Sequence, residues 1–229
     1  MGVLESLAGT LIVSCQAYPG EPMHDWRTTA QVARSVVIGG AAAVRVQGLA
    51  DIRATAAAVD VPVIGLIKDG GAGVYITPTL AHARDVVQAG ADIVALDGTR
   101  RPRPDGLTLA QTVAGIRELS QALVMADCGS AADARAAQDA GVDVVGSTLA
   151  GYTGERPATQ GPDLELLDEM VAMVTIPVIA EGRLHKPGHV VQALQRGAHA
   201  ACVGTAITHP TSITRWFNDA IVSACRGPD

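Results

Sequence analysis

Charged and aromatic side chains are both scarce in this sequence of 229 residues. Charged residues make up 17% and aromatic residues 3%, and the formal net charge is -6. A nucleic-acid-binding surface needs clustered Lys and Arg, so this composition argues against nucleic acid as a partner. Because hydrophobic residues still reach 48%, the core must be built mainly from Ala, Val, Leu and Ile.

The sequence also lacks segments that would take it to a membrane. No apolar run approaches the roughly 20 residues that a spanning helix needs. The first ten residues contain no basic region and no small-residue cleavage site, so they do not resemble a secretion signal. The four cysteines show no CxxC spacing. We therefore expect a reduced, cytoplasmic protein with no membrane partner.

Motifs for metals, nucleotides and redox cofactors are missing as well. The sequence contains no P-loop, no GxSxG nucleophile elbow and no zinc motif. His185 and His189 are four residues apart, but Pro187 lies between them and no carboxylate stands at ligand spacing. We expect neither a metal nor a cofactor.

The sequence does contain a regular alternation of short apolar runs and Ala-rich helical patterns. Apolar side chains three and four positions apart predict amphipathic helices, for example at 81–90 and 131–141. Gly90, Gly141 and Gly197 stand where three of these helices should end. The apolar runs predict strands at 10–15, 42–46, 61–67, 92–96, 122–126, 143–147, 176–180 and 200–204.

Eight such strands alternating with helices predict a (β/α)8 TIM barrel that forms one domain over residues 1–229. An open doubly wound sheet is the alternative fold. That fold usually carries a glycine-rich phosphate loop after its first strand, whereas this chain continues with QAYPGEPMH. No linker, low-complexity tract or change in composition indicates a domain boundary.

Polar side chains stand at almost every predicted strand end, where a barrel of this kind places its active site. Ordinary turns would be richer in Gly, Asn and Ser. The residues at these positions are Gln16, Arg45, Lys68, Asp97, Asp127, Thr148, Glu181 and Gly204.

Strands three and seven face each other in a ring of eight, so Lys68 and Glu181 should approach one substrate from opposite sides. This arrangement suits removal of a proton from one face of a carbon and return of a proton to the other face. A structural ion pair between the two side chains is the alternative, although buried pairs are weak stabilisers.

Glycine-containing loops follow the last two predicted strands. AEGR at 180–183 and VGTAIT at 203–208 occupy the positions where many barrels hold a phosphate group on backbone N–H groups. We therefore expect a phosphorylated substrate.

Sequence blocks spread over about residues 10 to 217 carry a specific resemblance. In chain order they are IVSCQAYPGEPMH, PVIGLIK, YITPT, ADIVALDGTRRPRPDG, MADCGS, GSTLAGYT, GPDLELL, PVIAEGRLHKP and GAHAACVGTAIT. The blocks resemble those of the N-acylglucosamine-6-phosphate (N-acetylmannosamine-6-phosphate) 2-epimerases. The resemblance implies a phosphate-binding TIM barrel that epimerises C2 of N-acetylmannosamine 6-phosphate to give N-acetylglucosamine 6-phosphate. The reaction belongs to sialic acid breakdown and needs no redox cofactor.

The resemblance also implies roles for single residues. The family's catalytic lysine falls on Lys68 and its catalytic glutamate on Glu181. Its polar site residues fall on Gln16, Arg45, Asp127 and Arg183, and its phosphate loops on Gly182 and Gly204. We add Thr148 to the substrate-binding set as a strand-end residue, and Thr205, Ala206 and His209 to the phosphate-binding set as neighbours of Gly204.

One position departs from the family pattern. The family usually has Gly-Gly-Ala-Ile-Thr-Arg-Pro near its end, and this chain has Gly-Thr-Ala-Ile-Thr-His-Pro at 204–210. His209 therefore replaces the arginine expected to help hold phosphate. We expect it to be a weaker phosphate ligand, so that His209→Arg lowers KM.

Two other functions fit a lysine at the end of a barrel strand. A Schiff-base aldolase would use Lys68 as its nucleophile on a sugar phosphate. A non-catalytic barrel would bind a sugar phosphate without converting it, but the intact Lys68, Glu181 and Asp127 argue against that function. In each case the partner is a small-molecule sugar phosphate, and we expect the chain to form a homo-oligomer, a dimer.

Overall fold

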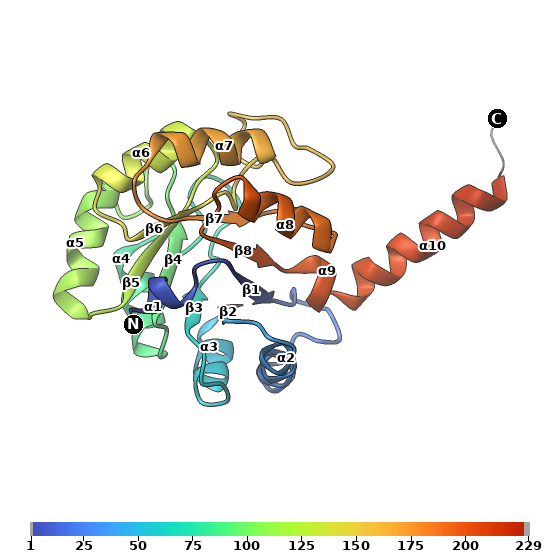
Figure 1. Cartoon of the computed structure of the whole chain (residues 1–229). Coiled ribbons are helices and arrows are strands. Elements are labelled where there is room, and N and C mark those ends of the chain that lie inside the picture. The colour runs from blue at the N-terminus through green and yellow to red at the C-terminus, as the bar shows by residue number, and fades with distance from the viewer. Residues whose placement is uncertain (1, 227–229) are drawn as a thin grey trace.

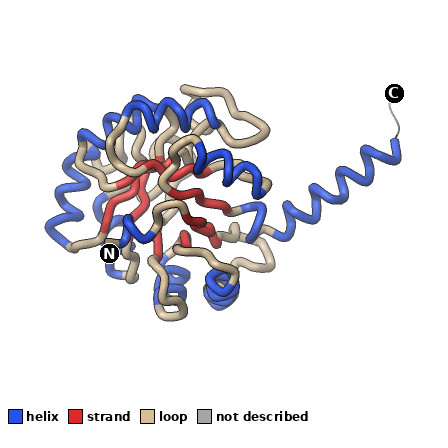
Figure 2. Tube along the Cα trace, in the orientation of Figure 1, coloured by secondary structure: helices blue, strands red, loops and turns tan. Residues whose placement is uncertain are grey.

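The computed structural model describes residues 2–226 and shows eight parallel strands closed into one barrel (Figures 1 and 2). Each strand pairs with its sequence neighbours, and β1 pairs with β8 to complete the ring. The predicted (β/α)8 barrel is thereby confirmed. The strands are β1 (Thr10–Cys15), β2 (Ala43–Gln47), β3 (Val63–Leu66), β4 (Ile93–Asp97), β5 (Leu123–Asp127), β6 (Val144–Gly146), β7 (Val178–Glu181) and β8 (Ala200–Val203).

The observed strands begin later than predicted where a proline precedes them. β3 starts at Val63 and β7 at Val178, because Pro62 and Pro177 have no N–H to donate to a neighbouring strand. Each proline still accepts one bond through its carbonyl, from Val44 N–H and from Val145 N–H respectively.

Helices follow the strands and form the outer layer of the barrel (Figure 1). Gly90, Gly141 and Gly197 have φ values of 101°, 89° and 95°, so they end their helices in the left-handed conformation, as predicted. The helices are α1 (Val3–Ser6), α2 (Trp26–Ile38), α3 (Leu49–Ala56), α4 (Leu80–Gln88), α5 (Leu109–Leu119), α6 (Ala131–Asp139), α7 (Leu164–Met173), α8 (Pro187–Gln195), α9 (Thr205–Thr208) and α10 (Pro210–Arg226).

The core has two apolar layers, because alternate strand residues point to opposite faces. One layer fills the inside of the barrel with residues such as Ile12, Ile64 and Ile179. The other lies between strands and helices and consists almost entirely of Ala, Val, Leu and Ile. The scarcity of aromatic residues is therefore met by small side chains packed in two thin layers.

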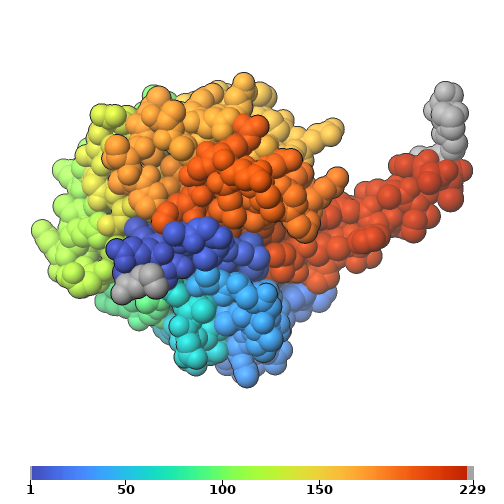
Figure 3. Space-filling view, in the orientation of Figure 1, coloured from blue at the N-terminus to red at the C-terminus, as the bar shows by residue number. Residues whose placement is uncertain are grey.

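Helix α10 departs from this arrangement. It extends away from the barrel, and most of its side chains are exposed (Figures 1 and 3). Trp216, Phe217 and Ile221 are 38%, 72% and 62% exposed. Among the described helices, none combines the length and the hydropathy that a membrane crossing requires.

Candidate active site

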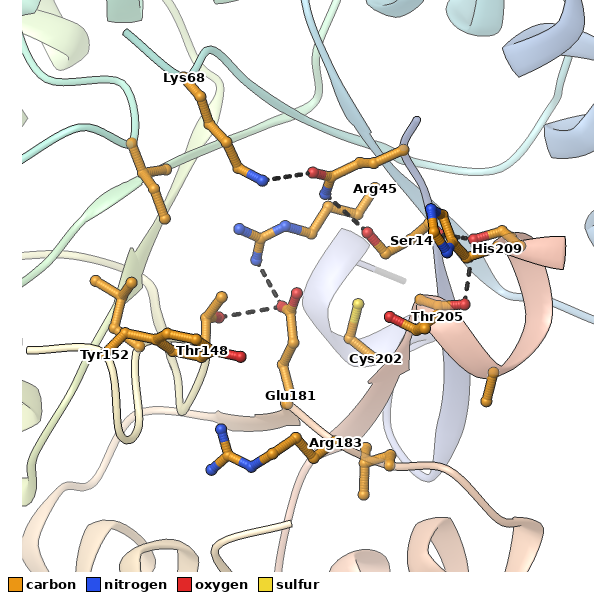
Figure 4. A pocket seen from close by; sticks show the side chains of 18 of the residues that line it. Ser14, Arg45, Lys68, Thr148, Tyr152, Glu181, Arg183, Cys202, Thr205 and His209 are labelled. Atoms are coloured by element: carbon orange, nitrogen blue, oxygen red, sulfur yellow. Dashed lines mark hydrogen bonds and ion pairs between the residues drawn. The ribbon is translucent and has the colours of Figure 1, made fainter. Parts of the chain in front are cut away.

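A cavity opens at the carboxyl ends of the strands. Its volume is about 500 Å³, within the range of about 300–1,000 Å³ that is typical of small-molecule sites. The residues predicted at the strand ends and in the two glycine loops line it, except Asp97 and Asp127 (Figure 4). Side chains from the ends of β1, β2, β3, β6, β7 and β8 meet there, because closure of the barrel brings all strand ends to one rim.

Lys68 lies two residues beyond β3 and forms an isolated antiparallel bridge with Ile76. Its Nζ donates a hydrogen bond to Gln16 Oε1 at 3.0 Å, and Gln16 Nε2 donates to Ser14 Oγ at 2.8 Å. Lys68 is therefore held by an uncharged amide rather than by Glu181. Burial lowers the pKa of Lys68 from its ordinary value, and the nearby guanidinium of Arg45 lowers this pKa further.

Glu181 ends β7 and enters the cavity from the side opposite β3 (Figure 4). Its Oε2 lies 2.6 Å from Arg45 Nη1 and 3.1 Å from Thr148 Oγ1. Burial raises the pKa of Glu181 above its ordinary value. Arg45 opposes this rise, and the negative charge of Asp127 adds to it.

Arg45 lies beneath the cavity and connects the acidic groups. Its Nη1 and Nη2 donate to the two oxygens of Asp127 at 2.9 Å and 2.6 Å, and the side chain is 1% exposed. Burial alone would lower the pKa of Arg45, but Asp127 and Glu181 together raise it. The guanidinium therefore stays charged, and Nε has no hydrogen-bond partner among the described residues.

We expected Asp127 to contact substrate directly, but the structure places it away from the cavity. It is fully buried behind Arg45 and does not line the cavity. Thr148 Oγ1 also donates to it, at 2.7 Å. Asp127 therefore contacts the cavity-lining side chains of Arg45 and Thr148 rather than the cavity itself.

The two glycine loops lie side by side at the rim beyond β7 and β8. Gly182, Gly204, Thr205 and Ala206 all line the cavity. Arg183 has a φ of 56°, and its guanidinium donates to Ala150 O and Gly161 O, both at 3.0 Å. No protein acceptor for its Nη2 appears within residues 2–226.

His209 has different partners from those expected. Its Nε2 lies 2.6 Å from Glu21 Oε1, and its Nδ1 lies 2.8 Å from Ser212 Oγ. Both ring nitrogens are therefore engaged by protein groups, although the ring lines the cavity. His185 also lines the cavity, and its N–H donates to His189 Nδ1 at 3.2 Å.

Sequence reasoning missed the tyrosines. The chain has three, and all of them line the cavity: Tyr18, Tyr75 and Tyr152. The signal available in the sequence was their scarcity. Because the core of this chain is built from aliphatic side chains, the few tyrosines are available to recognise substrate. Cys202 and Ser14, which lie within the predicted strands at 200–204 and 10–15, also reach the cavity.

Comparison with known proteins agrees with this geometry. A family profile described as "Putative N-acetylmannosamine-6-phosphate epimerase" matches residues 29–223. A relative from Cutibacterium acnes is 57% identical over 221 residues, covering 96% of each chain. Another, from Caldanaerobacter subterraneus, is 45% identical and covers 95% of this chain and 93% of its own. Both are named "Putative N-acetylmannosamine-6-phosphate 2-epimerase".

Solved structures agree as well. The N-acetylmannosamine-6-phosphate 2-epimerase from Clostridium perfringens superimposes with a TM-score of 0.93 at 38% identity, covering 96% of each chain. A thiamine phosphate pyrophosphorylase from Pyrococcus furiosus shares the fold alone, with a TM-score of 0.59 at 18% identity. The resemblance seen in the sequence blocks is confirmed, and this chain belongs to the N-acetylmannosamine-6-phosphate epimerase family.

Proposed function

We propose that this protein interconverts N-acetylmannosamine 6-phosphate and N-acetylglucosamine 6-phosphate by removing and returning the proton on C2. The observation that carries the proposal is the pair formed by Lys68 and Glu181, which face one cavity from strands four apart in the ring. The names of the relatives favour the same substrate pair. The reaction belongs to sialic acid breakdown.

The chemistry needs one base and one acid on opposite faces of C2. In the open-chain sugar C2 lies next to the C1 aldehyde, so loss of its proton gives an enolate. Neutral Lys68 accepts that proton, and protonated Glu181 delivers one to the other face. In the reverse direction the carboxylate of Glu181 is the base and the ammonium of Lys68 is the acid. Arg45, with its fixed positive charge, stabilises the negative charge that develops on oxygen.

The pKa shifts support these roles. The pKa of Lys68 is lowered, mainly by burial, and the pKa of Glu181 is raised, also mainly by burial. Each shift brings the pKa of the group closer to neutral pH, and a side chain with such a pKa both accepts and releases a proton readily. Gln16 is suited to hold Lys68 without neutralising it by an ion pair, because its amide carries no charge.

We assign the phosphate group of the substrate to the rim formed by Gly182, Arg183 and residues 204–206. Gly182 has a φ of 115° and no side chain, so the backbone can approach a phosphate closely there. The first N–H groups of a helix have no partner within the helix, which leaves those of Thr205 and Ala206 for phosphate oxygens. Arg183 Nη2 adds a charged donor.

The decisive experiment follows C2 by proton NMR during turnover of N-acetylmannosamine 6-phosphate in deuterium oxide. The proposal expects deuterium at C2 of the product, because both groups exchange their protons with solvent. Lys68→Ala and Glu181→Ala should each lower kcat by about 10²–10⁴-fold with the fold intact. Product that forms at the normal rate with C2 still protiated would rule out proton transfer through these side chains.

The lowered pKa of Lys68 also favours one competing function, a Schiff-base aldolase, because a neutral amine is a nucleophile. Borohydride reduction during turnover separates the two. An aldolase would be trapped and inactivated at Lys68 with a mass increase on that peptide, whereas an epimerase of the proposed kind would keep its activity and mass.

We propose that the protein works in the cytoplasm as a homodimer. All four cysteines are free thiols, which suits a reducing compartment. In a (β/α)8 barrel the helix after each strand packs on the outer ring, but α10, the long helix that comes after β8 and the short α9, extends away from its own barrel (Figure 1). We propose a second copy of this chain as the partner of α10, because exchange of α10 between two copies would cover the exposed apolar face of each helix.

A further inference from the structure

Two loops at the rim of the cavity are joined by a chain of contacts that the proposed chemistry does not use. The loop from β1 to α2 carries Tyr18 and Glu21. The α10 segment, by which we mean His209 and the first turn of α10, carries His209 and Ser212. Glu21 Oε2 accepts a hydrogen bond from Tyr18 N–H at 2.8 Å, and Glu21 Oε1 lies 2.6 Å from His209 Nε2. The carboxylate therefore bridges its own loop to the α10 segment.

The hydrogen bonds of His209 determine which ring nitrogen carries the proton. Ser212 N–H donates to Nδ1 at 3.3 Å, and the Ser212 hydroxyl lies 2.8 Å from the same atom. Because Nδ1 accepts, Nε2 carries the hydrogen and donates it to Glu21. The Tyr18 backbone bond lowers the pKa of Glu21, and the contact with His209 lowers it further. The ring thus offers substrate no free donor, and a carboxylate stands directly beside it.

Tyr18 is the side chain that this bridge positions. Its ring packs edge-on against His209 with ring centroids 5.8 Å apart, and its centroid lies 5.5 Å from Lys68 Nζ. Tyr18 therefore stands between the α10 segment and the base. The other groups that act on Lys68 are the amide of Gln16 and the charges of Arg45, Glu181 and Asp127, which lie on β2, β7 and β5.

We propose that Glu21 and His209 form a latch that holds Tyr18 over Lys68, so that Tyr18 is a positioning residue for proton transfer and His209 is not a phosphate ligand. The inference rests on the proposed epimerase function for its consequence in turnover. Opening the latch would give water access to Lys68. Since burial is the largest cause of the lowered pKa of Lys68, greater exposure should raise it and leave less of the neutral base.

A double-mutant cycle separates the latch from a phosphate contact. If His209 bound phosphate, His209→Ala would raise KM, and Glu21→Ala would lower KM by removing a negative charge that repels phosphate. The latch predicts that both single variants lower kcat in the same direction, with KM changed less than about twofold. It also predicts that the double variant loses little more than either single one, because residues acting as a unit are non-additive. Opposite effects on KM, or additive losses in kcat, would overturn the latch.

Direct titration of Lys68 tests the same idea without turnover. The chain has two lysines, Lys68 and the exposed Lys186, so acetic anhydride labelling at a series of pH values reports both in one peptide analysis. We expect Tyr18→Leu and His209→Ala to raise the pKa of Lys68, so that less of Lys68 is neutral and labelled at a given pH. Lys186 is the internal control.

Tyr18→Phe is the matched control, because it keeps the ring and should leave the pKa of Lys68 unchanged. An unchanged pKa in Tyr18→Leu and His209→Ala would refute the latch even if the wild-type chain epimerises its substrate. If instead the wild-type chain fails to epimerise while the labelling shifts appear, the proposed function fails and the latch stands.

Discussion

Arg45 controls the charge balance of the site more than any other residue. Its buried guanidinium contacts Asp127 with two hydrogen bonds and also contacts Glu181. It lowers the pKa of Lys68 and opposes the rise in the pKa of Glu181. A single fixed cation therefore favours the deprotonated, proton-accepting form of each group, the neutral amine and the carboxylate, while burial favours the uncharged form of each.

Asp127→Asn tests the pairing of Arg45. The substitution leaves a buried guanidinium without its bidentate carboxylate, and loss of one partner of a buried pair costs about 3–5 kcal/mol. We expect the free energy of unfolding in urea to fall by about 3 kcal/mol. Asp139→Asn is the control, because Asp139 and Arg135 form a pair that is 60% and 56% exposed. An equal loss in both variants would contradict the special role of Asp127.

The pH dependence of kcat follows from the two shifted pKa values. Below the pKa of Glu181 both groups are protonated, and Lys68 cannot accept a proton. Above the pKa of Lys68 both are deprotonated, and Glu181 cannot donate. Since the first pKa is raised and the second lowered, both limbs of the bell-shaped profile should lie inside the interval between the ordinary values of 4.5 and 10.5.

A pH-rate series measured at saturating substrate checks this expectation. The phosphate group of the substrate titrates at about pH 6. Its pKa is therefore measured separately by phosphorus NMR before the limbs of the profile are attributed to Glu181 and Lys68. Limbs at or outside the ordinary values would mean that burial does not tune the pair.

At the scale of elements, β3 positions Lys68 through close packing against the helical layer. A Cβ added at Gly65 would lie 2.7 Å from Ala91 Cβ, 2.9 Å from Ile52 Cδ1 and 3.0 Å from Val86 Cγ1. Only glycine therefore lets β3 approach the helix layer this closely. Because Lys68 follows three residues later, the position of its backbone depends on this contact.

Gly65→Ala should destabilise the barrel by about 1–3 kcal/mol through overpacking. Gly71→Ala is the matched control in the loop after Lys68, since an added Cβ there meets nothing within 4 Å. We expect that control to stay within about 0.5 kcal/mol of the wild-type free energy of unfolding. Urea unfolding of the two variants measures both, and equal stability would show that β3 shifts to accept a methyl group.

At the scale of the whole molecule, α10 extends away from the barrel (Figure 3) and exposes large apolar side chains. Phe217 and Ile221 are four residues apart and so share one helix face, which we call the apolar stripe, and Trp216 precedes Phe217. The helix also starts beside the cavity, where His209 contacts Glu21. Trp216 packs against His185, with ring centroids 4.7 Å apart. The proposed dimer contact therefore lies next to residues that line the cavity.

Charge placed on the stripe should dissociate the proposed dimer. We expect sedimentation velocity to show a dimer for the wild-type chain and a monomer for Phe217→Asp/Ile221→Asp. Arg215→Asp changes the charge of an exposed residue two positions before Phe217, which does not share its helix face, and should leave the dimer intact. A wild-type chain that sediments as a monomer, or a double variant that remains dimeric, would disprove exchange through this face.

Much of the fold and most of the site could be predicted from local patterns. The end of a strand can be recognised locally in the sequence, because an apolar run stops where a proline, glycine or polar residue interrupts it. Lys68 and Glu181 were recognisable for this reason, and the ring of eight strands then places them on opposite sides. The helix ends could likewise be predicted, because glycine readily adopts the left-handed conformation found at Gly90, Gly141 and Gly197.

The sequence by itself determined the barrel, the order of its strands and the identity of the polar residues at its rim, since periodicity and backbone preference act over a few residues. Only the tertiary structure decided which polar groups pair. It buried Asp127 behind Arg45, joined His209 to Glu21 and brought three tyrosines from separate loops to one cavity. These contacts join residues far apart in the chain, and their geometry depends on how closed strands and packed loops share space, which no local pattern encodes.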